Sequence, residues 1–344
     1  MTSRHKLLAL AIFLTSFATN ATGLFAAAQV AHGPASPASH ETGADSCTAD
    51  DIWYIDTRGS YASCCAEGTP HLRVERFLGT CHWAPAEQSE VTSPSARPQG
   101  TIVYIHGNRV SSATAKREGL RVYQGLKRHA AAEDGFRFVI FAWPADQIHG
   151  QLQDVRVKAA RTGAASWHLA HFLERMPGDE PVGLMGYSFG ARIVTGSLQL
   201  LASGQLGCYV LEHNGPGRST GVRTVLIASA LHSHWLNAGQ FHGLAVTQMD
   251  RLLLLNNSCD FALKRYHAIE RCSNPAALGY VGLSESRLVD HAAAVEQWNA
   301  RSVVGRDHSL APYLCSDCLM SKVWDTLRLD SQIAESHPVA STDE

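Results

Sequence analysis

The stretch Pro181-Val-Gly-Leu-Met-Gly-Tyr-Ser-Phe-Gly190 decides the fold of this chain. Its apolar first half meets a Gly-x-Ser-x-Gly motif at 186–190, and a helical pattern follows at once over 191–201. This order predicts a strand, a sharp turn with a serine at its tip, and a helix. Glycines let the strand and the helix pass close to the serine, and the helix start leaves free N–H groups beside it. We therefore predict that Ser188 is a nucleophile.

The same motif occurs a second time, at Gly217-Arg-Ser-Thr-Gly221. This copy follows the loop-forming residues His213-Asn-Gly-Pro216 and precedes a strand pattern over 222–228. Because its context is reversed, we interpret Ser219 as a loop residue. A glycine-rich turn without chemistry is the alternative interpretation of Ser188 itself.

A second piece of the same chemistry lies upstream, where the strand pattern Thr101-Ile-Val-Tyr-Ile105 runs directly into His106-Gly-Asn108. Acyl-transfer enzymes need two backbone N–H donors aimed at the developing oxyanion. One donor comes from the residue after the nucleophile, which is Phe189, and the other from a glycine-containing loop after an earlier strand, where Asn108 fits best. We interpret His106 as a structural group and not as the base.

Three segments resemble the α/β-hydrolase superfamily: Ile102–Asn108, Phe138–Pro144 and Gly186–Arg192. The strand that ends in Trp-Pro is similar to a bacterial subgroup whose substrates are mostly undefined. The resemblance extends from about residue 100 to residue 265. It implies a triad in the chain order serine, acid, histidine, and it leaves the substrate open.

The acid of such a triad is expected after a later strand, and Arg251–Leu255 has the pattern of that strand. Asp260 follows it, ahead of a new helix, and we predict it as the carboxylate that orients the base. The alternative interpretation of Asp260 is a helix N-cap, which aspartate also favours. Asp146, in the loop after Trp143-Pro144, is the second candidate.

The base must come later still, and the histidines after Asp260 are His267, His291, His308 and His337. His267 belongs to the next helix, His291 lies in a helical pattern over 289–298, and His337 lies in a polar tail. His308 sits where a short apolar run breaks into a loop before a C-terminal helix, a context that suits a general base. We predict His308 as that base.

Strand patterns alternate with helical ones from 101 to 270, which predicts an α/β fold: a doubly wound, mostly parallel α/β-hydrolase sheet with helices on both faces. Earlier strands are expected over 51–56 and 72–78, and helices over 116–128 and 154–175. We expect the insertion at 204–221 and the loop at 145–154 to shape the pocket.

The N-terminus has the pattern of a signal peptide over 1–28, with basic residues before an apolar core, Leu7–Ala18, that is short for a membrane span. We expect a linker over 29–46, the α/β-hydrolase domain over 47–329 and a polar tail over 330–344. The protein is accordingly expected to be secreted or periplasmic, with no stable membrane span after cleavage, and anchored to the membrane if the signal is not cleaved.

The nine cysteines fit an oxidising compartment and predict disulfides, although the odd number leaves at least one unpaired. Cys315-Ser-Asp-Cys318 has the spacing of a redox motif or a zinc half-site. Because no second C-x-x-C exists, we interpret the pair as a structural disulfide or as two core thiols.

The formal net charge of -2, with 17% charged residues, gives no basic excess for binding nucleic acid. The sequence predicts a secreted serine hydrolase that cleaves carboxylic esters of small-molecule or lipid-like substrates and needs no cofactor or metal. Two alternatives stay open: a non-catalytic surface or interaction protein with the same fold, and a peptidase or amidase with the same triad.

Overall fold

The computed structural model describes residues 51–60, 70–95, 100–131, 133–212, 218, 220–269, 274–289 and 294–328. The predicted signal peptide, linker and tail (1–28, 29–46 and 330–344) lie outside the described residues, as do Ser219, His291 and His337. Within the described ranges, no helix has the length and apolar character needed to cross a bilayer.

The strands are β1 (Asp51–Asp56), β2 (Arg73–Phe77), β3 (Trp83–Ala86), β4 (Thr101–Ile105), β5 (Arg137–Ala142), β6 (Val182–Tyr187), β7 (Gln205–Leu206), β8 (Tyr209–Val210), β9 (Val222–Ile227), β10 (Met249–Asn256) and β11 (Ala294–Asn299). The α-helices are α2 (Gln88–Thr92), α3 (Ser112–Lys127), α4 (Gln151–Glu174), α5 (Phe189–Leu201), α6 (Leu278–Val281), α7 (Arg301–Val304), α8 (Ala311–Leu314) and α9 (Asp317–Leu327). Short 3₁₀ helices are η1 (Arg58–Ser60), η2 (Ala245–Gln248), η3 (Leu263–Ala268) and η4 (Glu285–Arg287).

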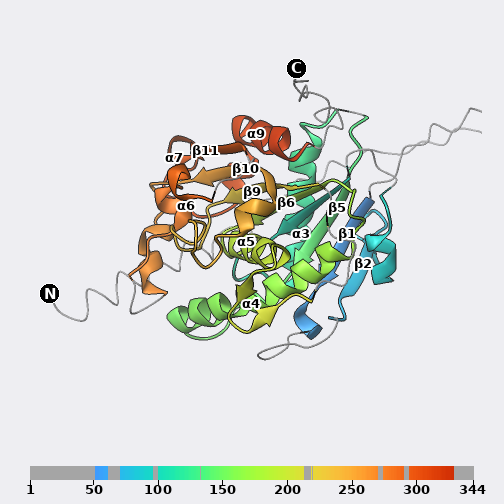
Figure 1. Ribbon diagram of the computed structural model, residues 1–344. Helices are drawn as coiled ribbons and strands as arrows, with labels where there is room; N and C mark the ends of the chain where they lie inside the picture. The colour runs from blue at the N-terminus through green and yellow to red at the C-terminus, as the bar shows by residue number, and fades with distance from the viewer. Residues whose placement is uncertain are drawn as a thin grey trace, which may run out of the picture.

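Nine of these strands form one twisted sheet in the order β11-β10-β9-β6-β4-β5-β1-β2-β3 (Figure 1). All neighbours from β11 to β1 are parallel, and only β2 and β3 at one edge are antiparallel. The central strands β4, β5 and β6 are buried along their whole length, because helices cover both faces of a parallel sheet. Their sequences are accordingly continuous apolar runs.

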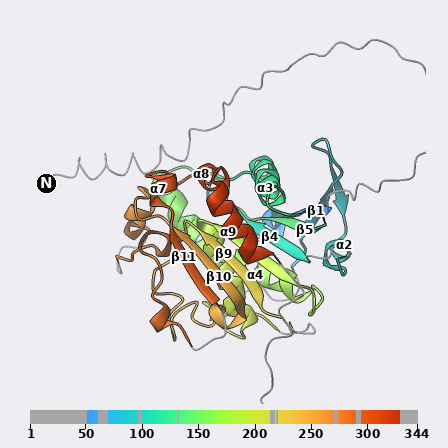
Figure 2. The ribbon, with the colours of Figure 1, turned by 90° about the horizontal axis from the view of Figure 1, so that it is seen from above.

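Helices α4 and α5 pack against each other over one face of the sheet, and α3, α8 and α9 pack together over the other (Figures 1 and 2). This arrangement confirms the predicted fold class in its architecture, an α/β fold with a doubly wound, mostly parallel sheet and helices on both faces. In a parallel sheet of this kind, ligands bind beyond the carboxyl ends of the strands, where the connections diverge.

Several element boundaries differ from the prediction. Helix α3 begins at Ser112, earlier than expected, because Ser111 caps it by accepting a hydrogen bond from the Thr114 N–H at 3.3 Å. The helix predicted over 289–298 is wrong, since Ala294–Asn299 form the edge strand β11. Most β11 side chains are exposed, so its sequence carries little apolar periodicity, and its backbone pairing with β10 determines its structure.

The described cysteines, Cys81, Cys208, Cys259, Cys315 and Cys318, are exposed and form no disulfide. The expectation that Cys315 and Cys318 form a disulfide or lie in the core is therefore wrong for this structure. Cys315 is the C-cap of α8 and Cys318 lies in the first turn of α9, and both are exposed. The other four cysteines lie outside the described residues, and disulfides among them stay a prediction.

Candidate active site

The register of the central strands brings the candidate residues to one edge of the sheet. Ile105 at the end of β4 pairs with Gly186 on β6, and Tyr187 at the end of β6 pairs with Ile227 on β9. The residues that follow these strands therefore emerge side by side. Ser188 is the first residue after β6, so it stands at the centre of this edge.

Ser188 occupies a strained turn between β6 and α5, with φ 53° and ψ -117°. A residue with a side chain is rarely found at positive φ, and such strain costs on the order of 1–3 kcal/mol. Three backbone hydrogen bonds hold the turn: the Ser188 N–H donates to the Ile227 carbonyl at 2.9 Å, and the Ala191 and Ala230 N–H groups donate to the Ser188 carbonyl, each at 3.1 Å. The neighbouring elements thus fix the serine in this conformation.

The two glycines of the motif are required by close backbone approach. A Cβ on Gly190 would lie 2.1 Å from the Ile105 carbonyl oxygen, and one on Gly186 would lie 2.6 Å from the Ala191 Cα. No ordinary side chain can occupy either position without moving β4 or α5. The glycines therefore act as predicted, by letting strand and helix pass close to Ser188.

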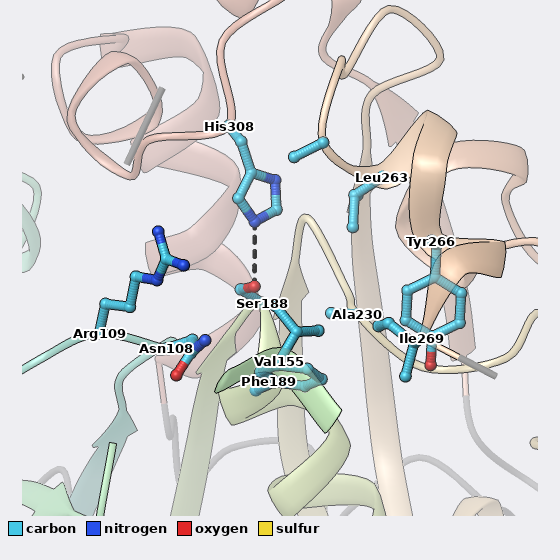
Figure 3. A pocket seen from close by; sticks show the side chains of 11 residues that line it. Asn108, Arg109, Val155, Ser188, Phe189, Ala230, Leu263, Tyr266, Ile269 and His308 are labelled. Carbon is cyan, nitrogen blue, oxygen red and sulfur yellow. Dashed lines mark hydrogen bonds between the residues drawn. The ribbon is translucent and has the colours of Figure 1, made fainter. Parts of the chain in front are cut away.

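A continuous chain of hydrogen bonds joins the three residues that the sequence predicted as nucleophile, base and acid. The Ser188 Oγ lies 3.0 Å from the His308 Nε2, the bond drawn in Figure 3. The His308 Nδ1 lies 2.6 Å from the Asp260 Oδ2. Ser188, His308 and Asp260 are 3%, 2% and 0% exposed, so the whole chain is shielded from water.

The second carboxylate oxygen of Asp260 fixes the orientation of this side chain. Its Oδ1 accepts hydrogen bonds from the Ala262 and Leu263 N–H groups, both at 2.9 Å. Asp260 therefore also holds the turn that leads into η3, but the N-cap of that helix is Ala262, so the N-cap interpretation of Asp260 is wrong. With Oδ1 held by the backbone, Oδ2 points to the imidazole.

Two hydrogen bonds from different elements hold the loop that carries His308. The Tyr187 hydroxyl donates a hydrogen bond to the His308 carbonyl, and the Asn257 Nδ2 donates to the Gly305 carbonyl at 2.8 Å. Burial raises the pKa of Tyr187 well above its usual value, so this phenol stays a neutral donor. The residue before the nucleophile and the loop before the acid thus position the imidazole.

The alternative candidates lie elsewhere. Asp146 is half exposed and pairs with Arg58 at 2.9 Å, so it does not contact His308. His106 is fully buried, and its Nε2 accepts a hydrogen bond from the Trp143 N–H at 3.3 Å. Burial lowers the pKa of His106 to about 3, so it is a neutral structural group at pH 7. His267 is exposed on η3.

Ser188 opens into a pocket whose empty space, counted together with the part open to solvent, is about 390 Å³. Asn108 and Phe189, the predicted oxyanion donors, both line this pocket beside Ser188 (Figure 3). Phe189 is the first residue of α5, so its N–H has no acceptor within the helix. The remaining described lining residues are Arg109, Val155, Ala230, Ala262, Leu263, Tyr266, Ile269 and His308.

This lining corrects one expectation. None of the described residues of 204–221 or 145–154 lines the pocket, whose apolar wall comes from η3 and the residues beside it. The described part of 204–221 instead forms the small hairpin of β7 and β8. Asp154, at the end of the segment 145–154, lies in the first turn of α4 and contacts Asn108 and Arg109, which line the pocket.

Asp154, which the sequence did not single out, is the centre of a buried polar cluster under the loop after β4. It accepts hydrogen bonds from the Arg109 Nε at 2.9 Å, the Lys158 Nζ at 3.0 Å and the Asn108 Nδ2 at 3.2 Å. Burial alone would raise the pKa of Asp154, but the hydrogen bonds, that of Arg109 first, outweigh it and lower the pKa. Asp154 thus holds the Asn108 loop in place.

No protein-family model matches the chain, and no curated protein matches its sequence. Among solved structures, the chain is similar to acyl-protein thioesterase 2 of Zea mays, at 16% identity over 68% of this chain and 96% of that chain, with a TM-score of 0.34. It is also similar to esterase B of Lactobacillus rhamnosis, at 14% identity over 80% and 85% of the two chains, with a TM-score of 0.37. A structure of that esterase inhibited with a tributyrin phosphonate aligns at 12% identity over 71% and 79%, with a TM-score of 0.32. At these scores the similarity assigns no role to any residue.

Proposed function

We propose that the protein is a serine hydrolase that cleaves carboxylic esters through an acyl-enzyme. The observation that supports this proposal is the buried chain of hydrogen bonds from Ser188 through His308 to Asp260. A buried serine at a strained turn, hydrogen-bonded to a base that an orienting carboxylate contacts in turn, has the arrangement of an activated nucleophile.

In the first step the Ser188 Oγ attacks the ester carbonyl carbon, and its proton moves to the His308 Nε2. Asp260 keeps the other imidazole proton on Nδ1, which leaves Nε2 able to accept. The Phe189 and Asn108 N–H groups stabilise the negative charge that develops on the carbonyl oxygen. Removing one such donor typically costs about 3–4 kcal/mol of transition-state stabilisation.

The tetrahedral intermediate then collapses, and the departing alkoxide takes the proton from the His308 Nε2 and leaves as an alcohol. The acyl group stays on the Ser188 Oγ. Water enters, gives a proton to the imidazole and attacks the acyl carbon, after which the serine regains its proton and the carboxylic acid departs. No step requires a group that these residues do not provide.

Labelling with a fluorophosphonate tests the proposed nucleophile directly. The reagent is expected to add to Ser188 in the native protein and not in the urea-unfolded protein, because only the folded site activates the hydroxyl. Mass spectrometry of the labelled peptide identifies the residue, and a panel of ester and amide substrates then separates an esterase from an amidase. An unlabelled native protein that hydrolyses none of the panel contradicts the proposal and favours the non-catalytic alternative.

Replacement of Asp260 with asparagine is expected to lower kcat by roughly 10⁴-fold while the fold is retained. The asparagine Oδ1 can keep the bonds from the Ala262 and Leu263 N–H groups, so the turn survives. Its NH₂ group, however, would face the His308 Nδ1 and favour the imidazole tautomer with the proton on Nε2. That tautomer cannot accept the serine proton. Steady-state kinetics with circular dichroism check both parts.

Asp146→Asn is the matched control, because it makes the same substitution at the second candidate acid. Asp146 is half exposed and contacts Arg58, away from the imidazole. We expect its kcat to stay within about threefold of the wild type, since exposed ion pairs contribute little. A larger loss from Asp146→Asn than from Asp260→Asn would reverse the assignment of the acid.

We also propose that the protein is exported to the periplasm or secreted. The support is the basic and then apolar N-terminal sequence over 1–28. The N-terminal sequence of the mature protein checks this proposal, since cleavage is expected within or directly after this segment.

A further inference from the structure

A buried carboxylate joins the loop after β4 (106–111) to helix α4. Asp154, in the first turn of α4, is 0% exposed. Its Oδ1 accepts hydrogen bonds from the Lys158 Nζ at 3.0 Å and from the Ile148 N–H at 3.1 Å. Its Oδ2 accepts from the Arg109 Nε at 2.9 Å and from the Asn108 Nδ2 at 3.2 Å. One oxygen is therefore held by α4 and the segment before it, and the other holds two residues of the loop that borders Ser188.

His106 orients the backbone of the same loop. The His106 Nε2 accepts a hydrogen bond from the Trp143 N–H at 3.3 Å, so the proton of the neutral ring lies on Nδ1. The Nδ1 then donates to the Gly107 carbonyl at 2.8 Å. A planar trans peptide directs its carbonyl and the following N–H to opposite sides. The Asn108 N–H therefore points away from the buried imidazole, and no group among the described residues accepts a hydrogen bond from it.

The peptide between Gly107 and Asn108 lies close to the nucleophile. A Cβ on Gly107 would lie 3.3 Å from the Ser188 Cβ, and Asn108 lines the pocket beside Ser188 (Figure 3). The next residue, Arg109, has φ 59°, in the left-handed region that residues with a Cβ seldom occupy. Such backbone strain persists only where surrounding contacts fix it. Asp154 provides such a contact at Arg109 and a second one at Asn108.

We propose that Asp154 is a positioning residue of the reaction: by holding the Asn108 side chain, it keeps the Asn108 N–H directed at the carbonyl oxygen of the substrate. This inference rests on the proposed esterase activity of Ser188. A donor stabilises the oxyanion most when it is already in place, because no free energy is then spent on moving it during the reaction. Asp154 is not among the described residues that line the pocket, so it acts through Asn108 and not on the substrate.

An ester and its thionoester, in which sulfur replaces the carbonyl oxygen, test this role. The pair is 4-nitrophenyl butanoate and O-(4-nitrophenyl) thiobutanoate, which share the acyl chain and the leaving group. Sulfur is a weak hydrogen-bond acceptor, so N–H donors accelerate cleavage of the ester more than cleavage of the thionoester. The ratio of kcat/KM for the ester to kcat/KM for the thionoester therefore measures the oxyanion donors. Damage to the triad or to the fold lowers both rates together and leaves this ratio unchanged.

The variant Asp154→Asn keeps the size of the side chain and replaces one accepting oxygen with an NH₂ group. We expect kcat/KM for the ester to fall by about 10- to 100-fold and the ester-to-thionoester ratio by about 10-fold, which is part of the 10²- to 10³-fold effect of one oxyanion donor. Asp51→Asn is the matched control, because Asp51 is also buried and pairs with Arg137 at 2.9 Å, at the start of β1 and away from the site. We expect it to keep the wild-type ratio. All rates are divided by the concentration of sites that fluorophosphonate labels at completion.

A second variant tests the proposal without disturbing the buried charges. Asn108→Ala removes the amide that donates to Asp154 and keeps the backbone N–H, while Arg109 and Lys158 stay paired with the carboxylate. We expect the ester-to-thionoester ratio to fall by about 3- to 10-fold. In the double variant with Asp154→Asn, the two effects are expected to combine to less than their product, because both substitutions remove the same contact. Asn108→Ala also provides the test if Asp154→Asn does not fold.

The outcomes separate this inference from the function on which it rests. If Asp154→Asn or Asn108→Ala lowers the ester and thionoester rates by the same factor, the contact is structural only, so the positioning proposal is wrong and the esterase proposal stands. If the effects of the two substitutions multiply in the double variant, Asp154 does not act through the Asn108 side chain, and the positioning proposal is again wrong. If Ser188 is not labelled and no ester is hydrolysed, both proposals fail.

Discussion

Ester turnover is expected to fall by about 10⁴- to 10⁶-fold when Ser188 is replaced with alanine, because the members of a triad act as a unit and loss of the nucleophile removes the covalent route. The Ser188 hydroxyl contacts His308, whereas the hydrogen bonds that hold the turn are made by the backbone. Alanine keeps those backbone bonds, so the melting temperature is expected to stay close to that of the wild type. Turnover is measured on the preferred ester, and stability by thermal unfolding.

Ser219→Ala is the control for this substitution, since it changes the serine of the second Gly-x-Ser-x-Gly motif. We expect it to leave turnover within about twofold of the wild type, as most substitutions outside a functional site do. Loss of activity in Ser219→Ala with retained activity in Ser188→Ala would mean that the wrong motif was chosen. If Ser188→Ala does not fold, the hydroxyl has a structural role. Fluorophosphonate labelling of the wild type then distinguishes a purely structural Ser188, which is not labelled, from a nucleophile, which is.

Two of the three central residues, Ser188 and Asp260, could be predicted from the sequence because each follows a largely buried strand of the sheet. In a parallel sheet the carboxyl ends of the strands meet at one edge, so Ser188 after β6 and Asp260 after β10 had to lie near each other. The glycines of the motif added a second constraint, the close passage of strand and helix. His308 was selected by chain order and by its loop, and the structure brings it within 3.0 Å of Ser188.

The pocket wall was not predicted, because tertiary packing decides it. Leu263, Tyr266 and Ile269 form the wall from a short 3₁₀ helix, and nothing in their spacing distinguishes a pocket wall from a core face. The buried cluster of Asp154 and Arg109 joins residues 45 positions apart. One signal was present: Asp154 and Lys158 have the i,i+4 spacing of a helical ion pair. The sequence alone does not show that the ion pair of Asp154 and Lys158 is buried.

The prediction for the segment of edge strand β11 was wrong for a related physical reason. Its residues are mostly exposed, so no apolar alternation indicates a strand, and the helical pattern of the sequence over 289–298 predicted a helix instead. Its structure depends on the hydrogen bonds that it makes with β10. The sequence therefore predicts the buried centre of the sheet, where side chains face the core on both sides, better than the sheet edge.

Replacement of His308 with glutamine is expected to reduce kcat by about 10⁴- to 10⁶-fold, as loss of the base does in other triads. Glutamine fills the space but cannot take the Ser188 proton, and the hydrogen bond from the Tyr187 hydroxyl goes to the His308 backbone carbonyl and can persist. The loop is therefore expected to keep its position, and the loss is chemical. Residual hydrolysis by the variant is measured at high enzyme concentration. The concentration of active sites in the wild-type reference is determined by titration with fluorophosphonate.

The pH dependence separates a chemical role of His308 from a structural one. In the wild type, kcat/KM is expected to rise with pH on the acid side, since a general base must be in its unprotonated form to accept the serine proton. In His308→Gln this limb should be absent from whatever rate remains. His267→Gln, at an exposed histidine of η3, should retain both the rate and the limb. If the acid limb survives in His308→Gln, the limb belongs to another group. If His308 is merely structural, its replacement lowers the rate equally at all pH values.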